Sequence, residues 1–594
     1  MSESTKKRVT RPMKERSTMP RTRSRHLTAP RAALAASLCL ALAAGGCSRG
    51  LFDDEHALLR LPKERLRDVE RRSLTPYIKQ RQSESPAPTL AQQHEAASSR
   101  FANVESVEMD LERCRQSALT NNLDLRIARI APSIESARVS EEEARFNAAF
   151  TLSAQTADFN QPTASTLVAA QSQTTRVTPG VRIPLRTGGT VSVDLPWNRN
   201  SDNNAFSTLN PSFATDFQFS ISQPLLRNAG RRANTASLRI AAFDEQSAEA
   251  RTKLEVIRQL AAVDRSYWRL YSARKQLEVR QQQYELAMEQ LARAERRVRA
   301  ELSTEIEVVR AQAGVAERLE GIILAQNDVL TQQRELKRII NEPGLTMSTT
   351  TVLVPSSEPD PVEYEFDREK LIAEALSNRM EMLDLELQLA ADAARIAFNR
   401  NQALPLLSLD YTYRLNGLGG STQDAMKQLR DDDFQDWALG LSAEIPLDNE
   451  QARSRIRQAV LLRQQRLASK DARALSITQE VLASIDQLDA TWQRILAARQ
   501  SVVLNTRSLQ AEQRQFDVGN STSTDVLDAA ARLADAQLAE IRAIADYQIA
   551  QVDLSFATGT LLGASKVSFE AEPQPDLDRP DPAESVEGAQ RADR

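Results

Sequence analysis

The sequence has few cysteines and histidines, which limits the chemistry it can perform. Of 3 cysteines in 594 residues, Cys39 and Cys47 lie near the N-terminus, which leaves Cys114 alone in the body of the chain. One thiol makes neither an internal disulfide nor a metal cage. Two of the 3 histidines, His26 and His56, also lie near the N-terminus. With no nucleophile–base pair, phosphate loop or metal-ligand spacing, the sequence predicts a protein that is not an enzyme and has no cofactor.

Neither charge dominates the chain. It has 76 basic and 80 acidic side chains, for a formal net charge of −4 at pH 7. Nucleic-acid-binding domains usually carry a basic patch or stripe. Because the mature chain is near neutral, we expect no nucleic-acid partner.

The N-terminus has the pattern of an export signal. Residues 1–31 are basic, an apolar run follows at Ala32–Ala44, and two glycines precede Cys47. A basic segment, a short apolar segment and small residues at the cut are typical of such a signal, and the run is shorter than the about 20 residues that span a bilayer. We predict an export signal over 1–46 with Cys47 acylated as in a lipoprotein; an ordinary cleaved signal is the alternative.

Two segments are expected to lie outside the folded part. Residues 47–100 read as a polar tether, which the lipid on Cys47 would anchor. Residues 566–594 are acidic and have almost no apolar side chains. Such a composition cannot offset the entropy of ordering by burial, so we predict a disordered acidic tail.

The rest of the chain repeats one plan of helix, strands, long helix, tip and helix. Three matched pairs of segments carry this repeat: Ala118–Asn121 with Ala375–Asn378, Pro224–Leu225 with Pro446–Leu447, and Glu307–Val308 with Asp525–Val526. We predict the following divisions: a first repeat over 101–345 (strands about 149–223, hairpin tip about 298–307), a linker over 346–366, and a second repeat over 367–565 (strands about 406–446, hairpin tip about 516–525).

Long helical runs dominate both repeats. Arg232–Ala300 contains neither Pro nor Gly, and as one helix it would be about 100 Å long. No ordinary globular core buries such a rod, so it must lie along other rods. Apolar residues at steps of three and four indicate coiled-coil seams, as at Ile477, Val481, Ile485 and Leu488.

Short segments between the helices alternate apolar and polar residues: Thr151–Gln155, Asp216–Ile221, Leu407–Tyr413 and Leu439–Ile445. In an exported protein this alternation favours a transmembrane β-barrel. Four strands cannot close a barrel, and an open edge in lipid leaves backbone groups unpaired, so the chain must oligomerise.

An inserted segment, Arg176–Leu195, reads as a further hairpin whose turn is Thr187–Gly189. It predicts either six strands per chain and a larger barrel, or a hairpin outside a four-stranded portion. Asn198–Ser207 and Leu418–Thr422 are predicted to be loops at the outer surface. Trp197 is either a membrane-interface anchor or a loop aromatic.

The two helical hairpins have related tips. In Gln515–Ala530, the turn at Val518 and Gly519 is followed by Asp525 and Asp528 on the first turns of the next helix, and Glu307 stands where Asp525 stands in the later copy. An acid in the first turn of a helix interacts favourably with the helix dipole. The arm before the first tip is one heptad longer, so the tips need not lie level. Arg293–Arg299 is either a solvated face or a docking surface.

Four segments resemble the TolC-like outer-membrane efflux protein family (outer membrane factors), of the lipoprotein type: Ser222–Arg227, Ile445–Leu447, Phe516–Gly519 and Asp525–Asp528. The likeness runs in order from about Val107 to Leu562. The turn at Asn520–Thr524 departs from the family pattern because it has no basic residue, which puts a salt-bridge lock there in doubt.

The resemblance implies a mostly α fold with a β-barrel portion, in which long coiled-coil hairpins of a homotrimer form an α-barrel joined to a transmembrane β-barrel. It further implies a channel in outer-membrane lipid that works with a periplasmic adaptor and an inner-membrane pump, in efflux or type I secretion. Asp525 and Asp528, and more weakly Glu307, would ring its periplasmic aperture. The alternative is a periplasmic coiled-coil scaffold or adaptor lipoprotein without a pore. Neither the substrate nor the partner pump can be read from the sequence.

Overall fold

The structure, a computed structural model, describes residues 104–164, 168–301 and 304–565, together with Gln92. All of them belong to one of the two units into which the chain divides, Pro88–Arg594. The predicted export signal, Cys47 and the tail over 566–594 lie outside the described residues, as does the tether apart from Gln92.

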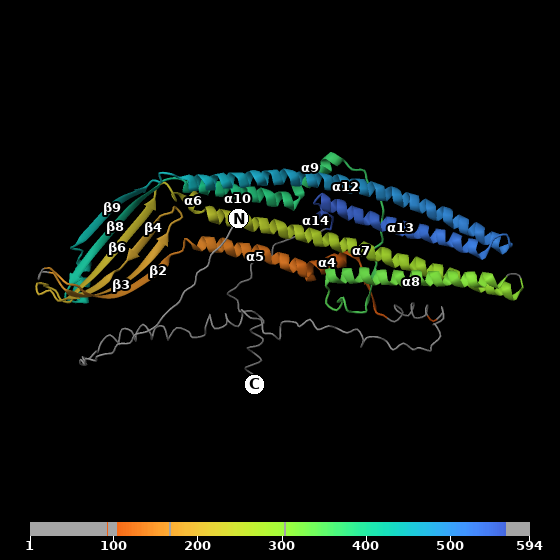
Figure 1. Ribbon diagram of the computed structural model, residues 1–594, viewed down its shortest axis with the longest axis horizontal. Coiled ribbons are helices and arrows are strands. Elements are labelled where there is room, and N and C mark those ends of the chain that lie inside the picture. Colours follow the sequence, from red (N-terminus) through yellow and green to blue (C-terminus); the bar gives the residue numbers. More distant parts are fainter. Residues whose placement is uncertain (1–91, 93–103, 165–167, 302–303, 566–594) are drawn as a thin grey trace, which may run out of the picture. The chain divides into compact units, whose positions relative to one another are not determined.

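The predicted duplicated plan is confirmed (Figure 1). The first repeat has these helices and this short strand: β1 Ser106–Met109, α4 Leu111–Asn121, α5 Leu123–Ala144, α6 Arg231–Asn234, α7 Ala236–Arg299 and α8 Glu305–Ile340. β7 Val352–Pro355 lies in the segment predicted as the linker. The second repeat has α9 Arg368–Asn378, α10 Met380–Gln402, α11 Thr422–Asp431, α12 Glu450–Asp517, α13 Ser523–Ala557 and α14 Leu561–Ala564.

The long rod predicted at Arg232–Ala300 is α7, with 64 residues, or about 96 Å at 1.5 Å per residue. It packs against α8, and also against α5, α10 and α13. The remaining long helix, α12, pairs with α13. Among the helices that the structure describes, none is long and apolar enough to cross a membrane.

The remaining strands form one antiparallel sheet: β2 Ala149–Asn160, β3 Gln171–Pro184, β4 Thr190–Asp194, β5 Trp197–Asp202, β6 Ser212–Pro224, β8 Leu406–Gly419 and β9 Gln435–Glu444. The order is β2-β3-β4-β6-β8-β9, and β5 follows β4 in the position between β3 and β6. The inserted hairpin therefore lies within the sheet. Its turn uses Gly188 at φ +92°, a conformation that glycine adopts without steric cost.

Both predicted outer loops are partly wrong. The segment predicted as a loop from Asn198 begins inside β5, and β8 continues to Gly419 before α11 begins. β5 is rich in Asn, Asp and Ser, which disfavour strands. It is nevertheless held by ladders on both sides and by side chains, since Arg176 Nε donates to Asn198 Oδ1 at 2.6 Å. Pairing on two sides outweighs the weak local preference.

The register separates an apolar face of the sheet from a polar one. Phe217 pairs with Leu415, and Phe219 with Tyr413 and Val193, so these side chains share a face. That face also carries the following residues: Phe150, Leu152, Val181, Ile221, Tyr411, Trp437, Leu439 and Leu441. The opposite face carries Ser153, Arg182, Ser192, Gln218, Ser220, Asp410, Thr412, Arg414 and Ser442.

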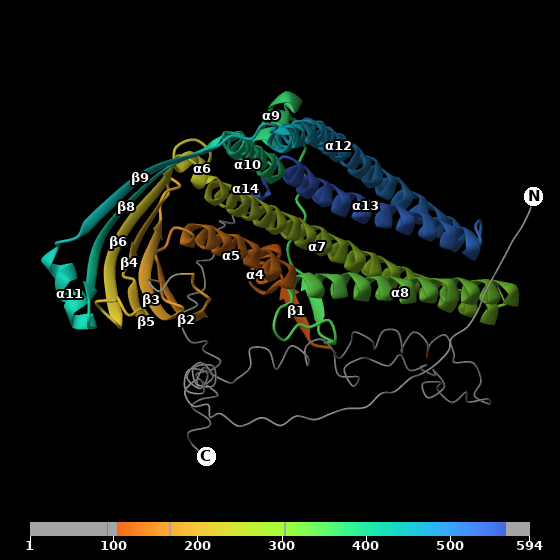
Figure 2. The same ribbon diagram turned by 60° about the vertical axis from the view of Figure 1, so that its left-hand side comes forward.

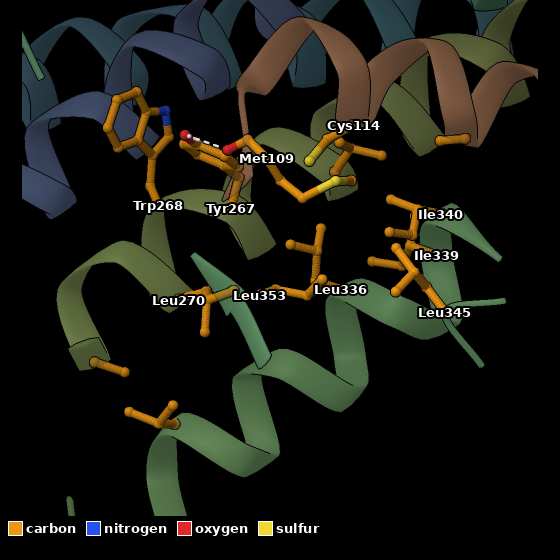
Figure 3. Packing of buried hydrophobic residues seen from close by; sticks show 14 residues of the cluster. Met109, Cys114, Tyr267, Trp268, Leu270, Leu336, Ile339, Ile340, Leu345 and Leu353 are labelled. Atoms are coloured by element: carbon orange, nitrogen blue, oxygen red, sulfur yellow. Dashed lines mark hydrogen bonds between the residues drawn. The ribbon is translucent and has the colours of Figure 1, made fainter. Parts of the chain in front are cut away.

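The largest hydrophobic cluster lies where the first repeat meets the linker (Figure 3). β1 and β7 pair in parallel there, which joins residues far apart in the sequence. Tyr267 of α7 is fully buried; its hydroxyl donates to the Met109 carbonyl at 3.2 Å and accepts from the Ser357 N–H at 2.8 Å. A buried tyrosine with both bonds made ties α7 to the β1–β7 pair.

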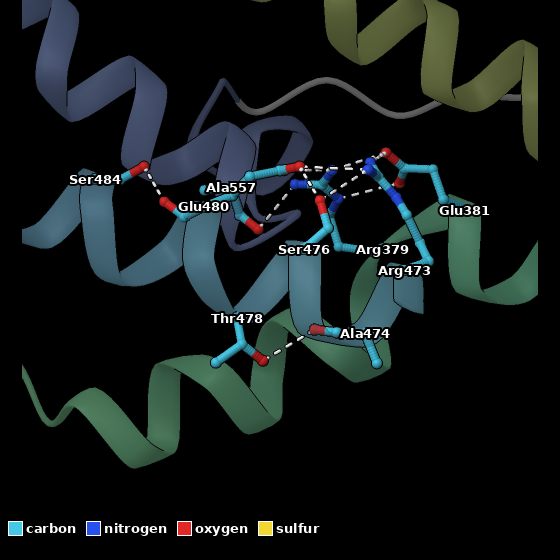
Figure 4. Close-up of polar contacts among 9 residues, drawn as sticks. All are labelled: Arg379, Glu381, Arg473, Ala474, Ser476, Thr478, Glu480, Ser484 and Ala557. Atoms are coloured by element: carbon cyan, nitrogen blue, oxygen red, sulfur yellow. Dashed lines mark hydrogen bonds and ion pairs between the residues drawn. The ribbon is translucent and has the colours of Figure 1, made fainter. Parts of the chain in front are cut away.

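In each repeat, an equivalent hydrogen bond joins the start of the second helix to the end of the long helix that follows the tip. In the first repeat, Asn122 Nδ2 donates to the Ile339 carbonyl at 2.9 Å. In the second, Arg379 Nη1 donates to the Ala557 carbonyl at 3.2 Å. The arginine brings a charge cluster with it, since Arg379 Nη2 lies 2.7 Å from Glu381 Oε1 and 3.0 Å from Glu480 Oε2 (Figure 4).

Arg473 completes this cluster by pairing with Glu381 at 2.8 Å. Burial alone would raise the pKa of Glu381, but the hydrogen bonds and charge of Arg379, together with Arg473, hold this pKa at about 2. The second repeat therefore makes this junction with a guanidinium that is paired with an ionised carboxylate, where the first repeat uses a neutral amide.

Candidate functional site

The second hairpin tip is a short turn closed by glycine. α12 ends at Asp517, and Gly519 adopts φ +84°. This left-handed residue lets the Gly519 N–H reach the Phe516 carbonyl at 3.0 Å and the Asn520 N–H reach the Gln515 carbonyl at 2.9 Å. The Val518 side chain is exposed at the turn.

A capping box starts α13 directly after this turn. The Thr522 hydroxyl oxygen accepts from the Asp525 N–H at 3.3 Å, and Asp525 Oδ2 accepts from the Thr522 N–H at 2.9 Å. The same carboxylate oxygen lies 2.7 Å from Thr522 Oγ1. Two backbone donors at the helix start are thus satisfied reciprocally.

The second tip carries two exposed carboxylates. Hydrogen bonds from the Thr522 hydroxyl and N–H lower the pKa of Asp525, so this group is ionised at neutral pH. Asp528 follows one turn later and is also exposed. Within the described residues, neither carboxylate forms an ion pair with a basic side chain.

The first tip has a different arrangement at the equivalent positions. Glu301 takes the left-handed position at φ +59°, and Thr304 caps α8 without a side-chain bond. Glu307, the counterpart of Asp525, pairs with Arg310 Nη1 at 2.8 Å through its Oε1. Arg310 occupies the place that Asp528 has in the second tip. These two charges cancel, whereas the other acids of this tip, Glu301 and Glu305, are exposed and form no ion pair among the described residues.

One arginine connects the two hairpins close to their tips. The Arg297 guanidinium lies over the Phe516 ring, 4.7 Å from its centroid, and Nη1 donates to the Phe516 carbonyl at 3.3 Å. Phe516 is itself buried with Leu509 and Val526. Arg297 is therefore a structural contact, whereas the sequence had suggested a solvated face or docking surface for its segment.

Further along the arms, Arg542 Nε donates to Gln276 Oε1 at 3.0 Å. Gln276 lies 25 residues before Glu301, and Arg542 lies 20 residues after Thr522. At 1.5 Å per residue the first arm extends about 7 Å further from this contact. Figures 1 and 2 show the α7–α8 tip projecting slightly beyond the α12–α13 tip.

Sequence reasoning located the tip residues but missed two of their partners, Arg297 and Arg310. The pairing of Arg310 could have been predicted from the sequence. Arg310 lies three residues after Glu307, at the position that Asp528 has in the second repeat. The contact between Arg297 and Phe516 joins different helices, and no spacing in the sequence predicts it.

Comparisons with known proteins agree with this architecture. The family described as "Outer membrane efflux protein" matches residues 190–342 and 371–560, which is more than half of the chain. The outer membrane protein TolC of Vibrio cholerae is 27% identical over 305 residues, which cover 50% of this chain and 67% of TolC. TolC of Escherichia coli is 25% identical over 305 residues, covering 50% and 60%. The chain thus aligns with about three fifths to two thirds of these relatives.

A solved structure with the same fold is the open state of the MtrE outer membrane channel of Neisseria gonorrhoeae. Its TM-score is 0.55 at 16% sequence identity, and the match covers 76% of this chain and 89% of MtrE. This likeness concerns the fold. Together with the family match over both repeats, it shows that the chain belongs to the outer membrane efflux protein family.

Proposed function

We propose that this protein is the outer-membrane channel of a tripartite efflux or type I secretion system. As a trimeric conduit it would pass substrates from an inner-membrane pump and a periplasmic adaptor across the periplasm and outer membrane. The observation that carries the proposal is a sheet with one apolar and one polar face, continued by helical hairpins with rods of about 96 Å. Such a conduit needs no covalent chemistry, no cofactor and no metal.

The sheet needs partners at both edges. Among the strands that the structure describes, β2 pairs only with β3, and β9 only with β8. Apolar side chains on both edge strands are exposed, including Phe150 at 71% and Trp437 at 70%. An open edge is not tolerated in lipid. If three chains associate with β9 of one chain beside β2 of the next, the sheets close into a barrel of about 18 strand positions. Barrels of this size leave an aqueous channel.

The helices also offer apolar surface for a neighbouring chain. Ile127, Ile130 and Ile134 on α5 are exposed, as are Leu461, Leu462 and Leu475 on α12. Exposed apolar patches of this kind mark interaction sites. They support a homotrimer in which α5 and α12 of adjacent chains pack together and extend the barrel into a helical tunnel.

The second tips would then form the periplasmic aperture. Three copies of Asp525 and Asp528 would give two rings of carboxylates, which attract cations and repel one another across a closed opening. Opening would move the arms apart near Gly519 and Glu301. Glu307 would have a supporting or docking role, because Arg310 neutralises it.

The proposed location is the outer membrane, with the helices in the periplasm and acylated Cys47 as a second attachment. The test is single-channel recording of the purified protein in planar bilayers, with chemical crosslinking to count chains. We expect crosslinked trimers, cation-selective conductance and block by divalent cations. Well-folded trimers without conductance would refute the channel and favour a scaffold without a pore.

A further inference from the structure

A pocket of about 680 Å³ lies at the end of the sheet farthest from the helical hairpins, beside α11 (Figure 2). Strands β6, β8 and β9 contribute its floor, and the segment between α11 and β9 contributes one wall. Leu209, from the loop before β6, closes another side. Pockets of about 300–1,000 Å³ are the size that binds small molecules in proteins.

The register places the pocket on the polar face of the sheet. Gln218 pairs with Arg414 on that face, and residues two apart on a strand point the same way. Asp216 and Asn416, which pair with each other and line the pocket, therefore belong to the same face. Asp436 also lines the pocket and pairs with Arg414. Under the proposed function this face lines the conduit, so the pocket lies near its outer end.

One part of the pocket is apolar, although the face around it is polar. Leu418 follows Asn416 on that face and pairs with Ala214. The Asn416 N–H donates to the Phe434 carbonyl at 2.9 Å, so Phe434 continues β9 opposite Asn416. The side chains of Leu209, Leu418 and Phe434 are all exposed. Apolar side chains gathered in an open pocket mark an interaction site.

The rest of the pocket is acidic. Asp216, Asp433 and Asp436 line it, and among the described residues of its lining none is basic. Asp436 Oδ1 accepts from Asn416 Nδ2 at 2.8 Å, and Arg414 Nη1 lies 3.9 Å from its other oxygen. Within the part of the chain that the structure describes, Asp216 and Asp433 form no ion pair. Two carboxylates of the pocket thus have no basic partner.

The basic side chains around the pocket do not offset these acids. On the polar face, Arg414 Nη2 donates to Gln218 Oε1 at 3.0 Å, and Arg176 Nε donates to Asn198 Oδ1 at 2.6 Å. On α11, Lys427 and Arg430 are followed directly by three acids: Asp431, Asp432 and Asp433. Acidic groups outnumber basic ones in the pocket and beside it, so the local potential favours a cation.

We propose that this pocket binds amphiphilic organic cations, with the charged group near Asp216 and Asp436 and the apolar body against Leu418 and Phe434. Carboxylates attract a cation more strongly where apolar walls exclude water, and the Phe434 ring adds a cation–π contact. The proposal rests on the proposed function, in which the polar face lines the conduit. It names a substrate class and a binding place close to the point of release.

Binding of two ions of the same shape and opposite charge tests the pocket. The purified trimer in detergent is titrated with tetraphenylphosphonium and with tetraphenylborate in a calorimeter, with empty micelles as the reference. We expect the cation to bind at least about tenfold more tightly than the anion. Asp216→Asn with Asp436→Asn should weaken binding of the cation about tenfold.

A matched control separates the pocket from the general charge of the polar face. Asp410 and Glu444 lie on the same face at the end near the hairpins. Asp410→Asn with Glu444→Gln therefore makes the same change of charge far from the pocket and should leave the affinity unchanged. An equal loss of affinity in this control would show that charge spread over the face attracts the cation, and it would overturn the pocket.

The apolar part has its own test. Leu418→Ser with Phe434→Ser should weaken binding of tetraphenylphosphonium about tenfold, because less apolar surface is buried. Phe434→Leu keeps an apolar side chain and should keep most of the affinity. Tetramethylammonium has the same charge without the aromatic body, and equally tight binding of this ion would overturn the assignment to amphiphilic cations.

Single-channel conductance of the same variants separates this proposal from the conduit. Equal affinity for both tetraphenyl ions, or unchanged affinity after Asp216→Asn with Asp436→Asn, would overturn the pocket while conductance persists. Folded trimers of the parent protein without conductance would instead refute the conduit, and with it the assignment of the bound cations as transported substrates.

Discussion

The two repeats build the same tip and the same helix junction, but they place charge differently at both. In the first repeat, Arg310 cancels the charge of Glu307, and Asn122 makes the junction through a neutral amide. In the second, Asp525 and Asp528 are free of ion pairs among the described residues, and Arg379 makes the junction within a charged cluster.

The comparison shows that duplicated backbones do not require duplicated electrostatics. Each helix C-terminus has carbonyl acceptors to satisfy, and an amide N–H or an arginine N–H can donate to them. The net charge at each junction and tip can therefore differ between the two repeats. In a threefold assembly, the matched positions would supply unpaired acids from the second tips, at Asp525 and Asp528, and a neutral pair from the first tips, at Glu307 and Arg310. The following predictions test this asymmetry, from the largest expected effect to the smallest.

The junctions should respond differently to acid. Glu381 has a pKa of about 2 in the folded state and about 4.3 in an unfolded chain. A lowered folded pKa stabilises the protein above the unfolded value, so about 3 kcal/mol of local stability is lost as pH falls from about 4.3 towards 2. Hydrogen exchange should show the start of α10 losing protection in this range.

The start of α5, held by Asn122, is the internal control and should keep its protection. Glu381→Gln should remove most of the pH dependence at α10. Equal acid sensitivity of the two junctions in the parent protein would contradict the assignment of the effect to this carboxylate.

The tips should differ in their effect on ion selectivity. Asp525→Ala with Asp528→Ala removes six carboxylates from a trimer, and we expect the cation-to-anion permeability ratio to fall about tenfold, with loss of divalent block. Glu307→Gln with Arg310→Gln removes a neutral pair and should leave the ratio nearly unchanged. Single-channel reversal potentials in a salt gradient measure both. Unchanged selectivity in the aspartate variant would sink the aperture assignment.

The helix caps should differ in their contribution to stability. Thr522→Ala removes the hydroxyl that accepts from the Asp525 N–H, while the bond from the backbone N–H of residue 522 to Asp525 remains, and it should cost about 1 kcal/mol at the second tip. Thr304→Ala should cost almost nothing, because Thr304 makes no side-chain cap bond. Hydrogen exchange in the first turns of α13 and α8 reports each value. A similar cost at both sites would mean that the caps are not the source of the difference.

The smallest expected effect concerns the contact between the hairpins. Arg297→Met keeps the length of the side chain but loses the cation–π contact with Phe516, which is worth about 0.5–1 kcal/mol. We expect the tips to exchange amide hydrogens faster by a factor of about two to five. Arg299→Met is the matched control, since Arg299 is exposed in the last turn of the same helix.

A double-mutant cycle with Phe516→Leu should give a coupling energy of the same size. A coupling energy near zero would show that the two side chains contribute independently.

Much of the fold follows from the sequence because its signals are local and repeated. Neighbouring residues determine the apolar seams, the alternating strands and the turn at Gly519. Because these patterns occur in both repeats, they predict the duplicated order of helices and strands. β5 was missed because ladders on both sides stabilise it against its own composition. α11 was not predicted, although Ser421 and Asp424 have the pattern of an N-terminal helix cap. A helix of 10 residues within a strand region is unexpected.

At the tips, the sequence predicted the positions of the acids but not their electrostatic state. Whether Glu307 is a free carboxylate depends on the rotamer of Arg310, and the link from Arg297 to Phe516 depends on how two separate coiled coils pack. Such contacts arise only after the rods are assembled.

Two strand pairs join segments far apart in the sequence, the parallel pair of β1 with β7 and the antiparallel pair of β6 with β8, and they set an order for folding. β1 and β6 are synthesised long before their partners, so the first repeat has unpaired strand edges until the second repeat follows. Such edges are sites of aggregation, and contacts this distant in sequence form slowly. Pairing of the two repeats is therefore a late step in folding, because these strand edges stay unpaired until β7 and β8 are present.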